Sequence, residues 1–429
     1  MTTSIADVRG RRIWDSRGRP TVEVEVELAG GAVGRAIAPA GASTGLGEAV
    51  DLRDGGKPHG GYDVRNALAG LAAEIRPDLI GADAADQAAI DARLIALDGT
   101  PNKGRLGANA TIATSMAVAH AVAASRGLPL WKHLCGDGEP GPLPLPEIQI
   151  FGGGAHAGRR IDIQDLMVIA VGAGDFATAL DWTAEVYRAA GEELKASDRL
   201  AGVADEGGFW PIFDTNEEAL GALVRAIERA GFRPGEDLAI SIDIAASEFG
   251  EDGTYRLDRE GRSLDRAAMV EMVLDWTRRY PVVSVEDPLA EDDEAGLIAF
   301  TEAAGPGLQI IGDDFLVTNA ERVRHAARVG ACNALLVKPN QAGTLTETKA
   351  ALHAARDAGY SAVVSARSGE TEDVTIVHLA VGWSVPQLKV GSFTRSERMA
   401  KWNEGLRLAE VLPSGGALAP RSAMPWGRR

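Results

Sequence analysis

Hydrophobic and polar positions alternate near the start of the chain. Over residues 21–28, valine and leucine occupy every second position and glutamate takes positions between them. This alternation predicts a strand with one buried face. Turn-forming residues precede it at 15–20, so residues 4–38 are expected to form a small antiparallel sheet. Residues 61–126 are rich in alanine and leucine and predict helices without strands.

The pattern changes after the turn-rich segment 136–142, which is the predicted linker between domains 1–138 and 139–429. Helical stretches there alternate with short apolar runs, and this order predicts βα units and a parallel sheet. A segment of about 290 residues suits a (β/α)₈-type barrel. The fold class is therefore α/β, a small α+β domain followed by an eight-stranded barrel. The apolar runs lie at 166–171, 238–242, 282–285, 309–311, 334–337, 362–364 and 387–388.

Composition narrows the function classes. The formal net charge of −17 argues against a nucleic-acid partner, which requires a basic face. Two cysteines in 429 residues favour a reducing compartment, hence the cytoplasm. No apolar run is long enough to span a membrane, and the start of the chain has no signal-peptide pattern. An anionic small substrate stays compatible with the acidic balance, because a bound metal reverses the local field.

Acidic side chains follow three of the apolar runs. Asp243, Glu286 and Asp313 each stand where a predicted strand ends. Because the C-terminal strand ends of a barrel share one rim, these carboxylates are expected to meet there. Like charges at that distance are tolerated mainly by sharing a proton or binding a cation, and oxygen ligands select Mg²⁺. A single acid after a strand is commonly only a helix cap, but three together favour a metal site.

Two lysines end further strands. Lys338 beside a dication is expected to have a depressed pKa and to act as a general base, and Lys389 stands at the same rim. Glu206 precedes two glycines and is an acid–base candidate. His156 lies in a glycine-rich loop, where a single histidine is often without function. Arg367 and the neighbouring Ser368 suit a phosphate or carboxylate clamp.

Over essentially its whole length the sequence resembles the enolase family, because many long motifs match in the same order. The matching segments are Asp15-Ser-Arg-Gly-Arg-Pro-Thr-Val-Glu23, Gly41-Ala-Ser-Thr-Gly45, Leu106-Gly-Ala-Asn-Ala110, Asp205-Glu-Gly-Gly208, Asp243-Ile-Ala-Ala-Ser-Glu-Phe249, Ser284-Val-Glu-Asp-Pro-Leu-Ala-Glu-Asp-Asp293, Gly312-Asp-Asp314, Lys338-Pro-Asn-Gln341, Arg367-Ser-Gly-Glu-Thr-Glu-Asp373 and Lys389.

The resemblance implies an N-terminal α+β domain that caps the barrel, a homodimer or higher oligomer, and two Mg²⁺ ions. It implies that Ser43, on the loop 39–45, reaches the second ion. Lys338 would take the proton alpha to the substrate carboxylate, and Glu206 would assist departure of the 3-hydroxyl. The resemblance assigns the remaining contacts to Lys389 for the carboxylate, Arg367 and Ser368 for the phosphate, and Gln164, Asp165 and His156 nearby.

Departures from the family pattern cluster around the substrate rather than the metal. Ala366 stands where enolases carry histidine, Asp165 replaces glutamate, and Gly152, Gln149 and Ala40 replace two asparagines and a serine. Ala366 therefore counts among the expected substrate-binding positions. This favours a diverged paralogue, of the carboxyphosphonoenolpyruvate synthase type in phosphonate and phosphinate biosynthesis, acting on a phosphorylated or phosphonate carboxylate. The alternatives are an ordinary phosphopyruvate hydratase, which converts 2-phosphoglycerate to phosphoenolpyruvate, and a non-catalytic binding protein on this scaffold.

Overall fold

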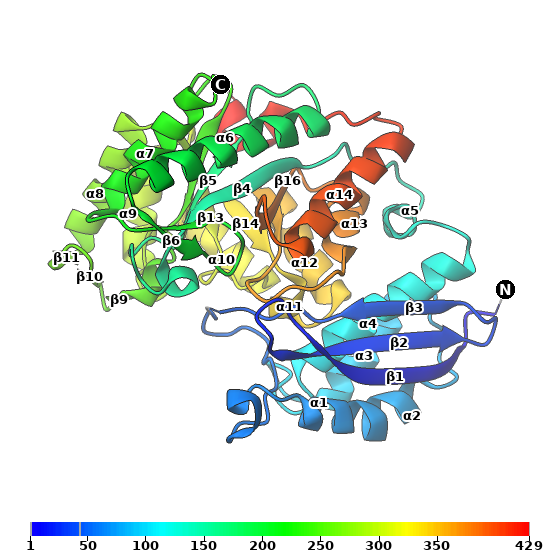
Figure 1. Cartoon of the computed structure of the whole chain (residues 1–429). Helices are drawn as coiled ribbons and strands as arrows, with labels where there is room; N and C mark the ends of the chain where they lie inside the picture. Colours follow the sequence, from blue (N-terminus) through cyan, green and yellow to red (C-terminus); the bar gives the residue numbers. More distant parts are fainter. Residues whose placement is uncertain (1, 43, 429) are drawn as a thin grey trace.

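The computed structural model describes residues 2–42 and 44–428, apart from the side chain of His156. Ser43, the expected ligand of a second ion, therefore lies outside the described residues. A smaller lobe, drawn in blue and cyan, lies against a larger barrel that runs from green to red (Figure 1). No helix in the described part of the chain has the length and apolar character needed to cross a bilayer.

The predicted N-terminal sheet is confirmed. It is an antiparallel meander of β1 (Ile5–Trp14), β2 (Pro20–Leu28) and β3 (Val33–Ile37). Val22, Val24 and Val26 of β2 are fully buried, as their alternation with glutamate predicted. The sheet packs on the alanine-rich helix α4 (Ala108–Ser125), and a Cβ at Gly34 of β3 would lie 2.2 Å from the Ala117 carbonyl oxygen. Small residues on both sides allow this close approach.

The rest of the smaller lobe is helical, as predicted. Helix α4 is buried on nearly all sides because it contacts the sheet on one side and the barrel helices α11 and α12 on the other. The elements of this region are η1 (Pro58–Gly61), α1 (Arg65–Gly70), the π-helical turn η2 (Leu71–Ile75), α2 (Arg76–Leu79), α3 (Gln87–Asp98), α4 and α5 (Leu130–Cys135). The predicted linker 136–142 contains neither helix nor strand.

The larger lobe is a closed eight-stranded barrel, because β16 pairs with both β15 and β4. Every barrel strand that follows β8 is parallel to its neighbours. The strands, in chain order, are β4 (Leu145–Gly152), β5 (Asp165–Ile169), β8 (Ala239–Asp243), β12 (Val282–Glu286), β13 (Gln309–Gly312), β14 (Ala334–Val337), β15 (Ser361–Ser365) and β16 (Gln387–Ser392).

The expectation of a wholly parallel sheet is wrong at one strand. β5 runs antiparallel to both β4 and β8. Its N-terminal end, with Gln164 and Asp165, therefore lies at the rim where the neighbouring strands have their C-terminal ends. The sequence pattern did not indicate β4, whose run includes a proline, a glutamate and a glutamine, all of them buried.

Helices cover the outside of the barrel and two small sheets project from it (Figure 1). One sheet extension is the hairpin β6 (Leu200–Val203) and β7 (Phe209–Pro211), and the other is β9 (Gly250–Glu251), β10 (Thr254–Leu257) and β11 (Arg262–Asp265). The helices are α6 (Phe176–Ala196), α7 (Asn216–Arg229), α8 (Arg266–Arg279), α9 (Glu294–Ala304), α10 (Ala320–Val329), α11 (Pro339–Ala342), α12 (Leu345–Asp357), α13 (Thr375–Gly382) and α14 (Ser396–Val411), with short turns η3 (Gly154–Ala157), η4 (Ala246–Glu248), η5 (Arg421–Ala423) and η6 (Pro425–Gly427).

Candidate active site

The predicted acids and lysines meet at the rim of the barrel. Asp243 and Glu286 are register partners on β8 and β12, and Asp313 directly follows β13. Lys338 directly follows β14, and Lys389 lies within β16. All five are buried, so each charge depends on its neighbours for stabilisation.

Lys389 lies among three carboxylates. Its Nζ donates to Oδ2 of Asp243 at 2.7 Å and to Oε2 of Glu286 at 2.8 Å, and it is 3.9 Å from Oδ2 of Asp165. Burial alone would lower the pKa of Lys389, but these carboxylates raise its pKa well above the ordinary value. The ammonium group therefore neutralises much of the negative charge on this side of the rim.

Lys338 pairs with a single acid, Asp313, to which its Nζ donates a hydrogen bond. Burial would lower the pKa of Lys338, but the nearby carboxylates, with Asp313 first and Glu286 after it, leave its pKa above the ordinary value. The depressed pKa expected for this lysine applies beside a bound dication and stays a prediction. Lys338 conversely holds the pKa of Asp313 below its ordinary value, against the effect of burial.

The surroundings of Glu286 disfavour its charged form. Burial raises its pKa well above the ordinary value, and the nearby Asp243 carboxylate raises it further. Its Oε1 is buried and has no hydrogen-bond partner among the described residues. A cation at this point would relieve both the repulsion and the missing contact.

A second group of acids brings oxygen atoms of Asp287, Asp313 and Asp314 within 4.8 Å of one another. Asp287 has a structural task there, because its two oxygens accept the backbone N–H groups of Asp313 and Asp314 at 2.9 and 2.8 Å. Burial raises the pKa of Asp287 to about 8. Asp287 thus orients the turn after β13 and directs Asp313 toward the rim.

One small cavity collects most of the predicted substrate residues. Gln164 donates from Nε2 to Asp243 at 3.0 Å, while its buried Oε1 has no partner among the described residues. Ala366 is 6% exposed and places only a methyl group in the wall. The lining residues are Gln164, Asp165, Glu206, Asp243, Lys338, Ser365, Ala366, Arg367, Ser368 and Lys389.

Glu206 lines the cavity although it does not lie on, or directly after, one of the eight barrel strands. It lies in the loop between β6 and β7, and its carbonyl oxygen accepts the Ser392 N–H at 2.8 Å. Gly207 next to it has φ +96°, a conformation that favours glycine. The two glycines that suggested a close backbone approach are therefore needed to bring this carboxylate to the rim.

Arg367 and Ser368 lie on the loop after β15, which the smaller lobe contacts. The Arg367 guanidinium donates to Oε2 of Glu48 at 3.1 Å, and Gln341 donates to both Glu48 and Asp313, at 3.1 and 2.8 Å. Ala40 and Gly369 exchange two backbone hydrogen bonds. Residues on both sides of Ser43 are thus fixed against the barrel.

Sequence reasoning missed several polar groups at the site. Gln341 ends one of the motifs that match the family, and Glu48 follows another closely. Both could have been noticed from the sequence, but neither was given a role. Glu147 carried no such signal, because its strand was not recognised. It is fully buried in the barrel beneath the rim, where Ser241 donates to it, and burial raises its pKa.

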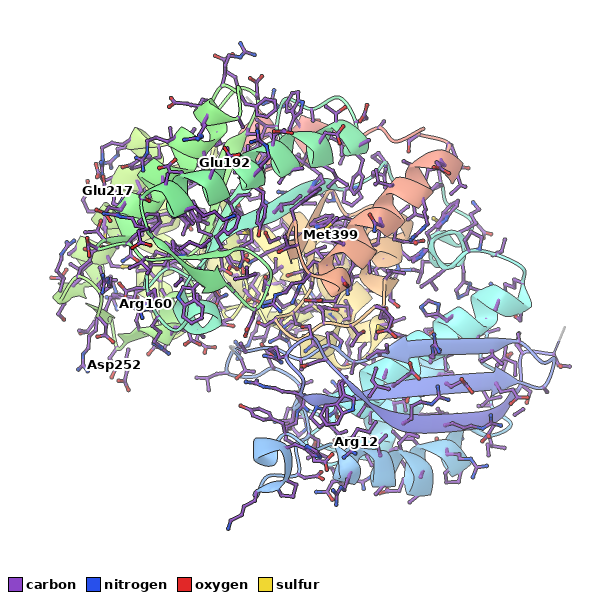
Figure 2. All side chains as sticks on the ribbon, viewed as in Figure 1. Arg12, Arg160, Glu192, Glu217, Asp252 and Met399 are labelled. Atoms are coloured by element: carbon purple, nitrogen blue, oxygen red, sulfur yellow. The ribbon has the colours of Figure 1, made fainter. Side chains whose placement is uncertain are left out.

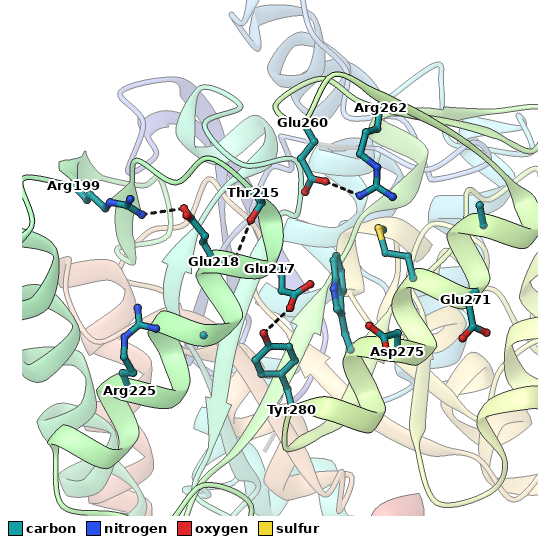
Figure 3. A pocket seen from close by; sticks show the side chains of 14 residues that line it. Arg199, Thr215, Glu217, Glu218, Arg225, Glu260, Arg262, Glu271, Asp275 and Tyr280 are labelled. Atoms are coloured by element: carbon teal, nitrogen blue, oxygen red, sulfur yellow. Dashed lines mark hydrogen bonds and ion pairs between the residues drawn. The ribbon is translucent and has the colours of Figure 1, made fainter.

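A larger open groove of about 900 Å³ lies far from Lys338, on the outside of α7 and α8 (Figure 3). Its charged side chains are engaged with neighbours, partly inside the groove and partly outside it, where Arg225 pairs with Glu193. Glu217 accepts from Tyr280 at 2.9 Å, Arg199 pairs with Glu218 at 2.9 Å, and Arg262 pairs with Glu260 at 2.9 Å. Because these charges are already engaged in surface ion pairs, the rim cavity is the better candidate for chemistry.

Comparison with known proteins follows the division between the lobes. Residues 5–134 match the family model described as enolase, N-terminal domain, and residues 141–424 match enolase, C-terminal TIM barrel domain. The chain is also 49% identical over 413 residues to a protein named Enolase 1 from Desulfitobacterium hafniense (strain Y51), covering 96% of this chain and 94% of that protein.

Proposed function

The chain belongs to the enolase family of lyase-type, generally Mg²⁺-dependent enzymes, and from that premise we propose that it is a diverged member of the family. It removes the proton alpha to the carboxylate of a small anion and forms an enolpyruvate that bears a phosphorus group. The substrate carries a phosphonate, or a phosphorus group bulkier than the phosphate of 2-phosphoglycerate, as in a carboxyphosphonoenolpyruvate synthase of phosphonate or phosphinate biosynthesis.

The rim acids fit a hard cation. Asp243, Glu286 and Asp313 would hold the first Mg²⁺, and the buried Oε1 of Glu286 without a partner among the described residues supports this assignment. Bound there, Mg²⁺ supplies Lewis-acid stabilisation for negative charge that develops on the substrate carboxylate. A second ion, with Ser43 as a ligand, is part of the same proposal.

Lys338 acts as the base and accepts the alpha proton at Nζ. It does so only as the free amine, so the Asp313 charge that raises its pKa has to be neutralised first. A cation held by Asp313 would have that effect. Glu206, across the cavity, assists departure of the leaving group.

The other cavity residues bind the substrate. Lys389 binds the carboxylate, while Arg367 and Ser368 bind the phosphorus group. Gln164 offers its Oε1, which has no partner in the described part of the chain, to a substrate hydroxyl. Asp165 lines the cavity on the side of β5, and His156, whose side chain is outside the described part of the structure, is proposed as a further polar contact.

The single observation that carries the proposal is Ala366. Its methyl group lines the cavity beside Arg367 and Ser368, at the position where the family pattern has an imidazole. A methyl in place of an imidazole enlarges the space next to the phosphorus-binding residues and removes a hydrogen-bond donor. Both changes suit a bulkier phosphorus group.

Ordinary phosphopyruvate hydratase activity is the second candidate. The observation that favours it is the 49% identity to a protein named Enolase 1 over almost the whole chain. The two candidates share Lys338, the metal ligands and the enolate chemistry, and differ only in the substrate.

Steady-state dehydration of 2-phosphoglycerate, by protein free of host enolase, separates the two candidates. Loss of one transition-state donor costs about 10²–10³ in rate, so we expect kcat at least about a hundredfold below a typical 10 s⁻¹. Ala366→His should recover part of this rate, and only part, because Asp165, Gly152 and Ala40 differ as well. Ordinary kcat/KM in the native chain would instead establish the hydratase.

A further inference from the structure

Gln149, which no motif singled out for a role, connects two walls of the candidate active site. It lies fully buried on β4, next to β5 and to the loop between β6 and β7. Its Nε2 donates to Oδ1 of Asp165, and its Oε1 accepts the backbone N–H of Gly208 at 2.7 Å. The amide nitrogen of Gln149 is therefore bonded to β5, and its amide oxygen is bonded to the loop between β6 and β7.

The space around this amide is filled to its limit. A Cβ at Gly208 would lie 2.4 Å from Oε1 of Gln149, and a Cβ at Gly152 would lie 2.5 Å from Cβ of Ala204. Real side-chain carbons do not approach so closely, so a side chain at Gly152 would push the hairpin loop away from β4, and one at Gly208 would displace either the loop or the Gln149 amide. Gln149 and the two glycines thus form one packed unit.

Three departures from the family pattern coincide in this unit. Gln149 is one methylene longer than the asparagine of the pattern, and Asp165 is one methylene shorter than its glutamate. The two side chains bond to each other. Their combined length is the same as in the family pattern, because the extra methylene of Gln149 on β4 offsets the methylene that Asp165 lacks on β5. Gly152 in place of asparagine leaves room for the hairpin loop beside the longer amide.

The loop held by Gln149 is the one that carries Glu206. The Ala204 N–H donates to the Gly208 carbonyl at 2.8 Å, and the Gly207 N–H donates to the Ala204 carbonyl at 3.0 Å. These bonds close a tight turn over residues 204–208, so fixing Gly208 also fixes Glu206.

We propose that Gln149 is a positioning residue that sets the distance of the Glu206 loop from Asp165, and that Gln149, Asp165 and Gly152 act as one compensated set. This inference rests on the proposed function for the role of Glu206. Lys338, which directly follows β14, has no part in the unit, so the set governs departure of the leaving group and not removal of the alpha proton.

The test compares Gln149→Asn, Asp165→Glu and the double variant in the full-length protein. Two quantities are measured with 2-phosphoglycerate and Mg²⁺: exchange of the alpha hydrogen with deuterated solvent, and formation of the enolpyruvate product. A displacement of about 1 Å costs about 10²-fold, so Gln149→Asn should reduce product formation by about that factor while alpha-hydrogen exchange continues. The double variant, which restores the summed length, should recover product formation.

A readout independent of activity is hydrogen–deuterium exchange of the Gly208 amide, followed by mass spectrometry of the segment 200–211. It should be faster in Gln149→Asn and return to the native rate in the double variant. Gln309→Asn is the matched control. Gln309 is also a fully buried barrel glutamine, bonded to Gln387 at 2.6 Å, but it lies at the start of β13, away from the rim. It should change neither readout.

Each outcome decides the proposal. It is overturned if Gly208 exchange stays native in Gln149→Asn, if the double variant recovers neither readout, or if alpha-hydrogen exchange and product formation fall by the same factor. A native chain that exchanges no alpha hydrogen of 2-phosphoglycerate would count against the proposed function on this substrate. The Gly208 exchange rates and their recovery in the double variant would then still decide the positioning role.

Discussion

The buried acids of the rim decide where the first metal ion would bind, and two different sets of three acids could hold it. Asp243, Glu286 and Asp313 form the predicted set, whereas Asp287, Asp313 and Asp314 are the acids whose oxygens lie within 4.8 Å. The hydrogen bonds from backbone N–H groups to both Asp287 oxygens favour the predicted set, because a carboxylate so engaged has little capacity left for a cation.

Asp243 and Asp314 each belong to only one set and therefore separate the groupings. Asp243→Asn should abolish tight Mg²⁺ binding, because one of three charged oxygen ligands is lost. Asp314→Asn should leave binding of the first ion intact. Isothermal titration calorimetry with Mg²⁺ measures both variants, and the reverse pattern would assign the ion to the Asp287 group.

Glu147 gives a prediction about pH. Burial raises its pKa above the ordinary value of 4.5, so the folded chain binds this proton more tightly than the unfolded chain. Its contribution to stability is therefore present below pH 4.5 and is lost as pH rises toward the folded pKa. Glu147→Gln stays neutral, and its free energy of unfolding relative to the native protein should increase between pH 5 and pH 8.

Urea unfolding at the two pH values measures this difference. Glu410→Gln, at an exposed position, is the control and should change stability by no more than about 0.5 kcal/mol at either pH. A Glu147→Gln protein that loses stability relative to the native chain as pH rises would contradict the raised pKa.

At the scale of elements, the sequence predicted most of the barrel because most of its strands contain a short apolar run. It failed at β4, where Glu147 and Gln149 break the apolar pattern although both are buried. It also could not indicate the reversed direction of β5, because an antiparallel strand has the same local composition as a parallel one. Direction depends on how the chain crosses between strands, and local periodicity does not record this.

Helix α14 supports the loop that carries the predicted phosphate clamp. Arg398, fully buried on this helix, donates to the carbonyl oxygens of Arg367, Val390 and Ser368 at 2.7, 2.9 and 2.6 Å. Arg398→Met removes all three of these hydrogen bonds, and the Ser368 carbonyl oxygen keeps only the Ser16 hydroxyl, at 3.4 Å. Because each lost bond costs about 1–3 kcal/mol, the free energy of unfolding should fall by about 3 kcal/mol or more.

The matched control is Arg407→Met on the same helix. Its side chain is 66% exposed and pairs with Glu404 at 2.8 Å, so the loss should stay within about 1 kcal/mol. Urea unfolding compares the two variants. Equal losses would show that the Arg398 hydrogen bonds do not hold the loop.

At the scale of the whole molecule, residues of the smaller lobe contact the rim of the barrel and complete the candidate site. Glu48 pairs with Arg367, and Lys103 with Glu347 at 2.5 Å, across more than 240 positions of the chain. Such contacts leave no local pattern, so the sequence identified the lysines, the acids and the clamp but not the partners they meet. The acidic side chains that give the net charge of −17 lie largely outside, as Glu192, Glu217 and Asp252 show (Figure 2).

Exchange of the alpha hydrogen of 2-phosphoglycerate with deuterated solvent, followed by proton NMR, tests the central claim most directly. The native protein should exchange this hydrogen with Mg²⁺ present and stop when Mg²⁺ is chelated. Lys338→Ala should not exchange it, although fold and metal binding persist, and Lys338→Arg should fail as well because arginine stays protonated. Exchange at the native rate in Lys338→Ala, or its absence in the native protein with Mg²⁺, would contradict the account.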